Sequence, residues 1–236
     1  MRLNKYLSSI GVCSRRHADR MIEEGRVTVD GKIAELGMSV LLGQQIEIDG
    51  KPVEQKNDER VLLLVNKPEG IVCTAERSEP DNIIDFLSFP SRIYPVGRLD
   101  KDSHGLILMT NIGSLCNEIT RAANGHEKEY IVKVDKRISS DFVKNMEKGV
   151  YLPELEVTTM PAKVKKLSEK EFSIILKEGR NRQIRRMCRQ LGYRVSDLKR
   201  IRVMDFKLDG IEEGKYRKAS EKELEVLDML INGRAD

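Results

Sequence analysis

The stretch VGRLDKDSHGLILMTN, residues 96–111, places Arg98 and Asp100 in a short polar segment directly before an apolar run. The run GLILMT is typical of a buried strand, so the two charged residues are expected in a loop at the end of that strand. A loop carboxylate with cations close enough to keep it ionised can act as a nucleophile or as a base. The alternative is a structural Arg98–Asp100 bridge across a turn, which is the commoner role of such a pair.

The composition is typical of a soluble globular protein with two domains. The chain has 236 residues, of which 34% are charged and 5% are aromatic, and its formal net charge is +4. No apolar run approaches the ~18 residues of a membrane span, and the N-terminus lacks the apolar core and cleavage site of a signal peptide. We therefore expect a cytoplasmic protein that does not enter a membrane.

The spacing of cysteines and histidines argues against a metal site. The cysteines are far apart and form no C-x-x-C pair, and the histidines do not cluster with them. We expect reduced, mostly buried cysteines and no set of metal ligands. The residues concerned are Cys13, Cys73, Cys116, Cys188, His17, His104 and His126.

Residues 1–50 have the pattern of a small module with two helices and a short sheet. Apolar residues recur at helical spacing over 3–10, and a second helix is expected after Ser14, which stands at an N-cap position. The DG pair at 30–31 between alternating apolar residues predicts a tight hairpin. The segment QQIEIDGK, residues 44–51, adds one more strand.

The helices of this module are expected to present a basic side. Residues 1–20 hold five basic side chains against Asp19 alone, although an ordinary solvated face would show the same pattern. The segments LNKYL, SRRHAD, GRVTVDGK and GQQIEIDG resemble the S-four RNA-binding domain, in which two helices and the following loop contact RNA backbone. The resemblance implies RNA contacts from Arg2, Lys5, Arg15 and Arg16.

A polar segment, KPVEQKNDER at 51–60, is expected to link this module to a second domain over 61–236. Strand and helix patterns are mixed in the second domain without strict alternation, which predicts an α+β fold with a mixed, mainly antiparallel sheet. Strands are expected at the start of 61–70 and at 105–110, 129–134, 171–177 and 202–208; helices are expected at 81–89, 113–124, 139–149, 181–191 and 220–231.

The strongest charge signal lies in residues 177–202, where ten basic residues stand against two acidic ones, a local net charge of +8. The helix expected at 181–191 places Arg185 in its first turns, where the helix dipole disfavours a cation unless an anion is near. That anion is a protein carboxylate, an RNA phosphate or both, and the alternative is a solvated basic helix without a partner. The basic residues are Lys177, Arg180, Arg182, Arg185, Arg186, Arg189, Arg194, Lys199, Arg200 and Arg202.

The opening segment and three others resemble one enzyme family. GRLDKDSHGLILMTN is similar to the active-site segment of pseudouridine synthases, and VNKPEGIV, HEKEYIVKV and EGRNRQIRRM are similar to other segments of these enzymes, in the same order. The similarity extends over nearly the whole chain. With the S-four module in front, the chain resembles the RsuA-like branch of the family, nearest the RluF-type, which acts on large-subunit ribosomal RNA.

The resemblance implies an RNA pseudouridine synthase that isomerises a specific uridine in ribosomal RNA, in the 23S RNA of the large subunit, with a tRNA as a further candidate. The target base must leave its stack, and its bond to the ribose moves from nitrogen 1 to carbon 5. Atoms and electrons are conserved, so no redox cofactor, metal or nucleotide is needed, and the sequence has no P-loop or dinucleotide fingerprint. We expect RNA as the partner, no DNA, and a monomer.

Residue by residue, the resemblance makes Asp100 the catalytic carboxylate, lets Tyr130 stack on the extruded uracil, and pairs Arg185 with Asp100. Arg180 and Arg182 compete with Arg185 for that pairing, and the sequence leaves the choice open. For Tyr130 the alternative is an ordinary strand aromatic. Further RNA contacts are expected from Arg98, Lys101, His104, Lys128, Arg180 and Arg182.

Two other functions fit the same residues. A non-catalytic RNA-binding or ribosome-assembly protein would keep the basic surfaces but would not need Asp100. A metal-dependent nuclease would use Asp100 with Asp102 and would lose activity to a chelator.

Overall fold

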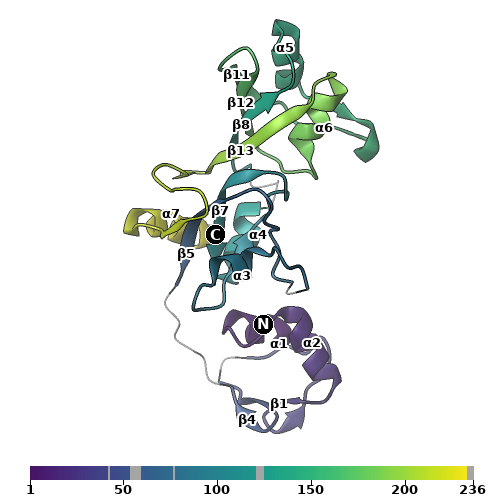
Figure 1. The fold of residues 1–236 in the computed structure, drawn as a ribbon. Coiled ribbons are helices and arrows are strands. Elements are labelled where there is room, and N and C mark those ends of the chain that lie inside the picture. Colours follow the sequence, from purple (N-terminus) through teal and green to yellow (C-terminus); the bar gives the residue numbers. More distant parts are fainter. Residues whose placement is uncertain (42, 54–59, 77, 121–124, 233–236) are drawn as a thin grey trace. The chain divides into compact units, whose positions relative to one another are not determined.

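The computed structural model describes residues 1–236 apart from positions 42, 54–59, 77, 121–124 and 233–236 (Figure 1). The chain divides into two compact units, Met1–Arg60 with Asn111–Gly113, and Val61–Thr110 with Ser114–Asp236. Each unit has a hydrophobic core of its own. Positions 54–59 of the expected linker lie outside the described residues. In the described part of the chain, no helix is long and apolar enough to span a membrane.

The first unit combines two short helices with a small antiparallel sheet. Ser14 caps the second helix, because its Oγ accepts a hydrogen bond from the His17 N–H at 3.2 Å. Asp30 and Gly31 have the positive φ angles of a tight hairpin turn, so the helices and the hairpin predicted from the sequence are confirmed. The elements are α1 (Leu3–Ser9), α2 (Arg15–Glu23), β1 (Val27–Val29), β2 (Lys32–Ile33), β3 (Ile46–Ile48) and β4 (Lys51–Pro52), and the strand order is β2-β1-β3-β4.

The second unit is built on a large mixed sheet. Its described strands follow the order β11-β12-β8-β13-β7-β5-β15, with β14 paired to β13 and β6 paired to β7. The β13–β7 pair is parallel and the other pairs are antiparallel, which confirms the predicted α+β class. The strands are β5 (Leu62–Lys67), β6 (Tyr94–Val96), β7 (His104–Thr110), β8 (Lys128–Val134), β11 (Lys163–Lys166), β12 (Glu171–Leu176), β13 (Val195–Val203), β14 (Phe206–Lys207) and β15 (Tyr216–Lys218).

Helices form at each of the five places where the sequence predicts one in this unit. Asn82 and Ser139 cap two of them, since each side chain accepts a hydrogen bond from a backbone N–H three residues further on. The last part of the helix expected at 113–124, positions 121–124, lies outside the described residues. The helices are α3 (Ile83–Leu87), α4 (Gly113–Thr120), α5 (Ser140–Lys148), α6 (Gln183–Gln190) and α7 (Glu221–Asn232); a short hairpin of β9 (Tyr151–Leu152) and β10 (Val157–Thr158) encloses a 3-10 turn, Pro153–Leu155.

The prediction of one continuous strand over 202–208 is wrong, although both ends of the segment lie in strands, β13 and β14. The chain reverses at Met204, whose φ is 53°, so this segment forms a hairpin between the end of β13 and β14. The first seven residues of β13, 195–201, were not predicted as a strand, because charged residues interrupt the apolar alternation.

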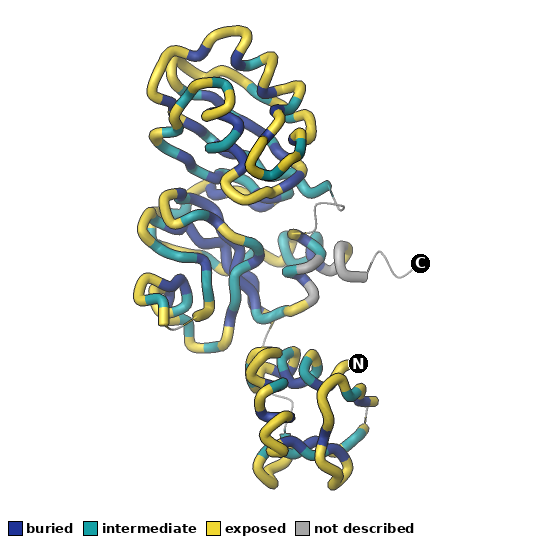
Figure 2. The backbone as a smooth tube through the Cα atoms, turned by 90° about the vertical axis from the view of Figure 1, so that its right-hand side faces the viewer, coloured by how far each residue is buried: buried dark blue, intermediate teal, exposed yellow. Residues whose placement is uncertain are grey.

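The position of the opening segment follows from this sheet. The strands β5 and β7 are buried along almost their whole length and form part of the core of the second unit (Figure 2). Since β7 begins at His104, the loop 97–103 leads directly into the buried part of the sheet. The sequence prediction of a charged loop at the end of a buried strand is confirmed.

Candidate active site

Asp100 lies in the loop 97–103, whose main chain is fixed on both sides of it. The Leu99 N–H donates to the sulfur of the buried Cys73 at 3.4 Å, and the Ser103 N–H donates to the Asp100 carbonyl at 3.1 Å. Burial raises the pKa of the Cys73 thiol. The Asp100 side chain is 32% exposed, so a rigid backbone presents a carboxylate that remains accessible.

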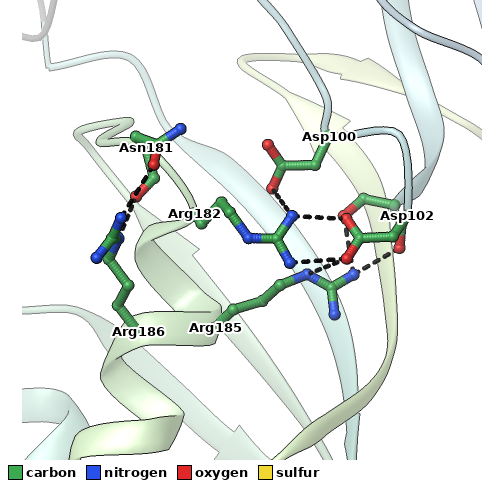
Figure 3. A network of polar contacts seen from close by, with 7 residues as sticks. Asp100, Asp102, Asn181, Arg182, Arg185 and Arg186 are labelled. Atoms are coloured by element: carbon green, nitrogen blue, oxygen red, sulfur yellow. Dashed lines mark hydrogen bonds and ion pairs between the residues drawn. The ribbon is translucent and has the colours of Figure 1, made fainter.

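Arg182 places its guanidinium between the two carboxylates of this loop (Figure 3). Its Nη1 lies 3.8 Å from Asp100 Oδ2, and its Nη1 and Nη2 donate to the two Asp102 oxygens at 3.0 and 2.7 Å. The hydrogen bonds from Arg182 are the main cause that lowers the pKa of Asp102 from its usual range. Arg182 precedes α6 and has a left-handed φ of 50°, which is uncommon for any residue except glycine.

Arg185 belongs to the same network but contacts Asp102 instead of Asp100. Its Nη2 donates to the Asp102 carbonyl at 2.5 Å and to Ser103 Oγ at 3.1 Å, and its Nε lies 3.5 Å from the Asp102 carboxylate. Asp102 is therefore the anion that the charge of Arg185 requires in the first turn of α6. Among the ion pairs of the described residues, the partner of Asp100 is Arg182, whereas the family resemblance implied Arg185.

A cavity of about 430 Å³ opens beside Asp100, a volume within the range of about 300–1,000 Å³ that small-molecule sites occupy. Tyr130, on β8, lines it and is 9% exposed, with its ring packed into the core. The structure therefore brings most of the second unit's predicted site residues around one cavity. These are Arg98, Asp100, Lys128, Tyr130, Arg180 and Arg182.

Among the charged residues that line this cavity, cations outnumber carboxylates. Burial lowers the pKa of Lys128, and the charge of Arg200 lowers it further. The Arg180 Nε donates to the buried Glu178 at 2.9 Å, and Glu178 also accepts a hydrogen bond from Gln183 at 2.8 Å. Glu178 thus holds Arg180 in place at the edge of the cavity.

The remaining predicted contacts lie elsewhere. Lys101 Nζ pairs with Asp81 at 2.9 Å, and His104 Nε2 lies 2.7 Å from an oxygen of Asp197. Neither Lys101 nor His104 is among the described residues that line the cavity. In the first unit, Arg2, Lys5, Arg15 and Arg16 are exposed.

A wider cleft of about 760 Å³ follows α6, and Arg182 lines both hollows. Glu154 pairs with two of its arginines, with one oxygen 3.2 Å from Arg186 Nη1. The cleft still carries more basic than acidic side chains. Its arginines are Arg182, Arg185, Arg186, Arg189 and Arg194.

Sequence reasoning missed four residues that shape the site. Asp102 entered it only as a possible metal ligand, although a second carboxylate two positions after Asp100 could have indicated an arginine clamp. Cys73 and Arg200 carry no local signal, since their roles arise from contacts between distant segments, whereas Glu178 contacts Arg180 and Gln183 close by in the sequence.

Each of the two units matches a known protein family. The family described as RNA pseudouridylate synthase matches residues 61–190, and the S4 domain matches residues 1–46. The dual-specificity RNA pseudouridine synthase RluF of Salmonella typhi is 50% identical over 98% of this chain and 80% of its own length. The ribosomal large subunit pseudouridine synthase B of Bacillus subtilis is 38% identical over 98% of this chain and 97% of its own.

A solved structure supports the same relationship. The crystal structure of a pseudouridylate synthase superimposes with a TM-score of 0.71 and 28% identity, and the alignment covers 95% of this chain and 98% of that one. The resemblance inferred from the sequence segments is confirmed in both units. The chain belongs to the RNA pseudouridine synthase family, the isomerases that convert uridine to pseudouridine in RNA, and carries an S4 domain ahead of its catalytic fold.

Proposed function

We propose that this enzyme modifies ribosomal RNA with Asp100 as its catalytic carboxylate. The observation that carries the proposal is the contrast within one loop: the main chain around Asp100 is hydrogen-bonded on both sides, while the carboxylate faces a cavity lined by Tyr130. A fixed backbone with an accessible side chain suits a group that must meet its substrate in one orientation.

The chemistry needs an ionised carboxylate whichever route it takes. The glycosidic bond between ribose carbon 1′ and uracil nitrogen 1 breaks, the base turns, carbon 5 bonds to the ribose and releases its proton, and nitrogen 1 gains one. Asp100 attacks the ribose, attacks the uracil ring, or removes a proton from the sugar. Arg182 Nη1, 3.8 Å from Asp100 Oδ2, places a positive charge beside the carboxylate in each case.

The other side chains of the cavity suit an extruded nucleotide. Tyr130 lines the cavity and is proposed to stack on the uracil, and Arg180 and Lys128 offer positive charge for the nucleotide's phosphates. Arg185 supports Arg182 through their shared partner Asp102. Arg98, Lys101 and His104 lie in or next to the same loop and are proposed to contact RNA around the flipped base; Arg2, Lys5, Arg15 and Arg16 are proposed to contact RNA backbone.

We propose large-subunit 23S RNA as the substrate, with a tRNA as a second one. The relatives support this choice by name, because one is described as dual-specificity and the other as acting on the large ribosomal subunit. We further propose a cytoplasmic monomer that does not act on DNA, with an RNA-binding module at 1–50, a linker at 51–60 and a catalytic domain at 61–236.

Substitution of Asp100 tests the catalytic assignment. Asp100→Asn is nearly isosteric, so the fold and RNA affinity should change little while turnover falls below detection, measured as tritium released from RNA labelled at uracil carbon 5. Activity within tenfold of the wild type would contradict the proposal. Wild-type turnover that persists in excess EDTA, on RNA shown to stay folded in monovalent salt, would separate the enzyme from a metal-dependent nuclease.

A further inference from the structure

Arg200 is a buried cation whose role the ion pairs of the active site do not explain. It lies on β13 and is 4% exposed. Its Nε donates to the Leu106 carbonyl at 2.7 Å and its Nη1 donates to the Arg98 carbonyl at 3.4 Å. Its Nη2 is buried and has no hydrogen-bond partner among the described residues. The contact with Arg98 reaches the main chain two residues before Asp100.

The backbone brings Arg200 to this place by a close approach of two strands. Arg200 pairs with Gly105 in the parallel register of β13 and β7. A Cβ atom on Gly105 would lie 2.2 Å from the Arg200 carbonyl oxygen, and Gly105 has a φ of +100°. The register of β13 against β8 also shifts between Arg200 and Arg202, and such irregularities change the direction of side chains.

A buried guanidinium with one unpaired arm is unfavourable for folding alone. Burying a charge costs free energy unless partners compensate for lost hydration, and the two hydrogen bonds of Arg200 are to neutral carbonyls. An apolar side chain of similar length would fill the same interior at a lower cost. The two bonds, in contrast, connect three segments that an apolar residue could not connect: β13, β7 and the loop 97–103.

We propose that Arg200 is a positioning residue for Asp100. Its guanidinium fixes the Arg98 carbonyl relative to β7 and so sets where the Asp100 carboxylate stands beside the cavity. Cys73 holds the same loop from the other side through the Leu99 N–H. The proposal rests on the catalytic role of Asp100 and assigns Arg200, which also lines the cavity, an effect on reaction rate that it exerts through the loop.

Arg202 provides a matched control on the same strand. It too is mostly buried, and its guanidinium donates to Glu129 at 2.9 Å, to Glu127 at 3.1 Å and to the Met204 carbonyl at 2.8 Å. None of these contacts leads to the loop of Asp100. Arg200→Lys and Arg202→Lys therefore each remove one guanidinium from the same strand. They differ in which groups that guanidinium binds.

The test compares the two variants in the full-length enzyme. The single-turnover rate at saturating enzyme, the dissociation constant for unmodified 23S RNA and the melting temperature are measured for each. Arg200→Lys should turn over about tenfold more slowly or worse with RNA affinity within twofold of the wild type, while Arg202→Lys keeps the wild-type rate at a comparable loss of melting temperature. Equal rates for the two variants, or a loss of RNA affinity that matches the loss of rate, would overturn the proposal.

If Arg200→Lys does not fold, Cys73→Ala tests the same proposal. It removes the acceptor of the Leu99 N–H, so a folded Cys73→Ala enzyme should also turn over more slowly at unchanged RNA affinity, and a wild-type rate would contradict control by the loop. Failure of the proposed function is distinguishable, because Asp100→Asn would then stay active whatever Arg200→Lys does.

Discussion

At the scale of single residues, the guanidinium that lies beside Asp100 is held in place by another carboxylate, Asp102. Asp102 binds both terminal nitrogens of Arg182 and so leaves Nη1 within 3.8 Å of Asp100. The arrangement needs a planar fork with two donors in fixed directions, which lysine does not have. It also needs the left-handed φ of Arg182, which turns the chain just before α6.

Arg182→Lys should therefore reduce the single-turnover rate by about tenfold or more, which corresponds to roughly 1.4 kcal/mol of transition-state stabilisation. The backbone strain is the same for both residues, so the melting temperature should change little. Arg189→Lys, further along α6, is the control and should keep a rate close to that of the wild type. If Arg182→Lys instead weakens RNA binding at an unchanged rate, Arg182 contacts a phosphate and does not support Asp100.

Sequence reasoning found the loop of Asp100 but not the geometry of its partners. A polar segment directly before an apolar run is a local pattern, and it predicts reliably that this loop lies at the end of a buried strand. Which of three nearby arginines reaches Asp100 depends on a left-handed residue and on Asp102, and no spacing rule predicts a positive φ at an arginine. The anion required near Arg185 was expected from the helix dipole, and Asp102 fulfils that expectation.

At the scale of elements, the least predictable strand is the one that completes the site. β13 places Leu198, Arg200 and Val203 in the cavity lining, between β8 and β7. Its sequence, VSDLKRIRV, has charges at positions where a half-buried strand would show apolar residues, because several of them pair across the sheet. The helices were easier to predict, since apolar residues at helical spacing and a cap such as Ser14 are local signals.

Gly105→Ala tests the close contact between β7 and β13. The new Cβ would meet the Arg200 carbonyl oxygen at 2.2 Å, and alanine also disfavours the φ of +100°, so the free energy of unfolding should fall by about 3 kcal/mol or more. The control is Gly210→Ala, at a φ of +74° with no atom within 4 Å of the new Cβ. That substitution carries backbone strain alone and should cost about 1 kcal/mol. Urea unfolding of both variants measures the difference, and equal losses would show that the two strands can separate freely.

The start of α7 is expected to contribute acid-sensitive stability. Arg217 on β15 binds both oxygens of Glu223, at 2.7 and 2.8 Å, and these bonds are the main cause that lowers the pKa of Glu223 from 4.5 to about 2. A lowered pKa in the folded state means that this stabilisation is complete above pH 4.5 and is lost as the pH falls toward 2.

Glu223→Gln should therefore lower the melting temperature at pH 7, and the difference from the wild type should shrink as the pH is lowered from 5 toward 3. Glutamine keeps the size of the side chain and loses only the charge that Arg217 binds. Glu221→Gln, an exposed residue in the same turn, is the control and should follow the wild type at every pH. A difference that stays constant with pH would show that the ion pair does not stabilise α7.

At the scale of the whole molecule, the chain consists of two compact units, and each has a hydrophobic core of its own. The S4 domain matches the first unit and the synthase family matches the second. This division was predictable because the polar segment 51–60 interrupts the apolar patterns on either side, and both modules carry recognisable local segments. The separation implies that affinity and rate can be changed independently.

Replacing Lys5, Arg15 and Arg16 together with glutamine tests that independence in the full-length protein. All three are exposed in the first unit, so the fold should tolerate the change. Each phosphate contact contributes about 0.7–0.9 to the slope of log affinity against log salt concentration, so three lost contacts should lower the magnitude of that slope by roughly 2 to 3. RNA binding at low salt should weaken, while the single-turnover rate at saturating enzyme should stay at the wild-type value, because the residues around Asp100 are untouched.

The control for this variant must lose the same charge elsewhere. Lys144, Lys148 and Lys222 are exposed in the second unit, and their replacement by glutamine lowers the net charge equally. If both triple variants show the same decrease in slope, the effect is one of net charge, and the first unit does not direct RNA binding. A decrease confined to the first variant assigns phosphate contacts to the two helices of the S4 domain, and a concurrent loss of rate would mean that these contacts also help to orient the target uridine at Asp100.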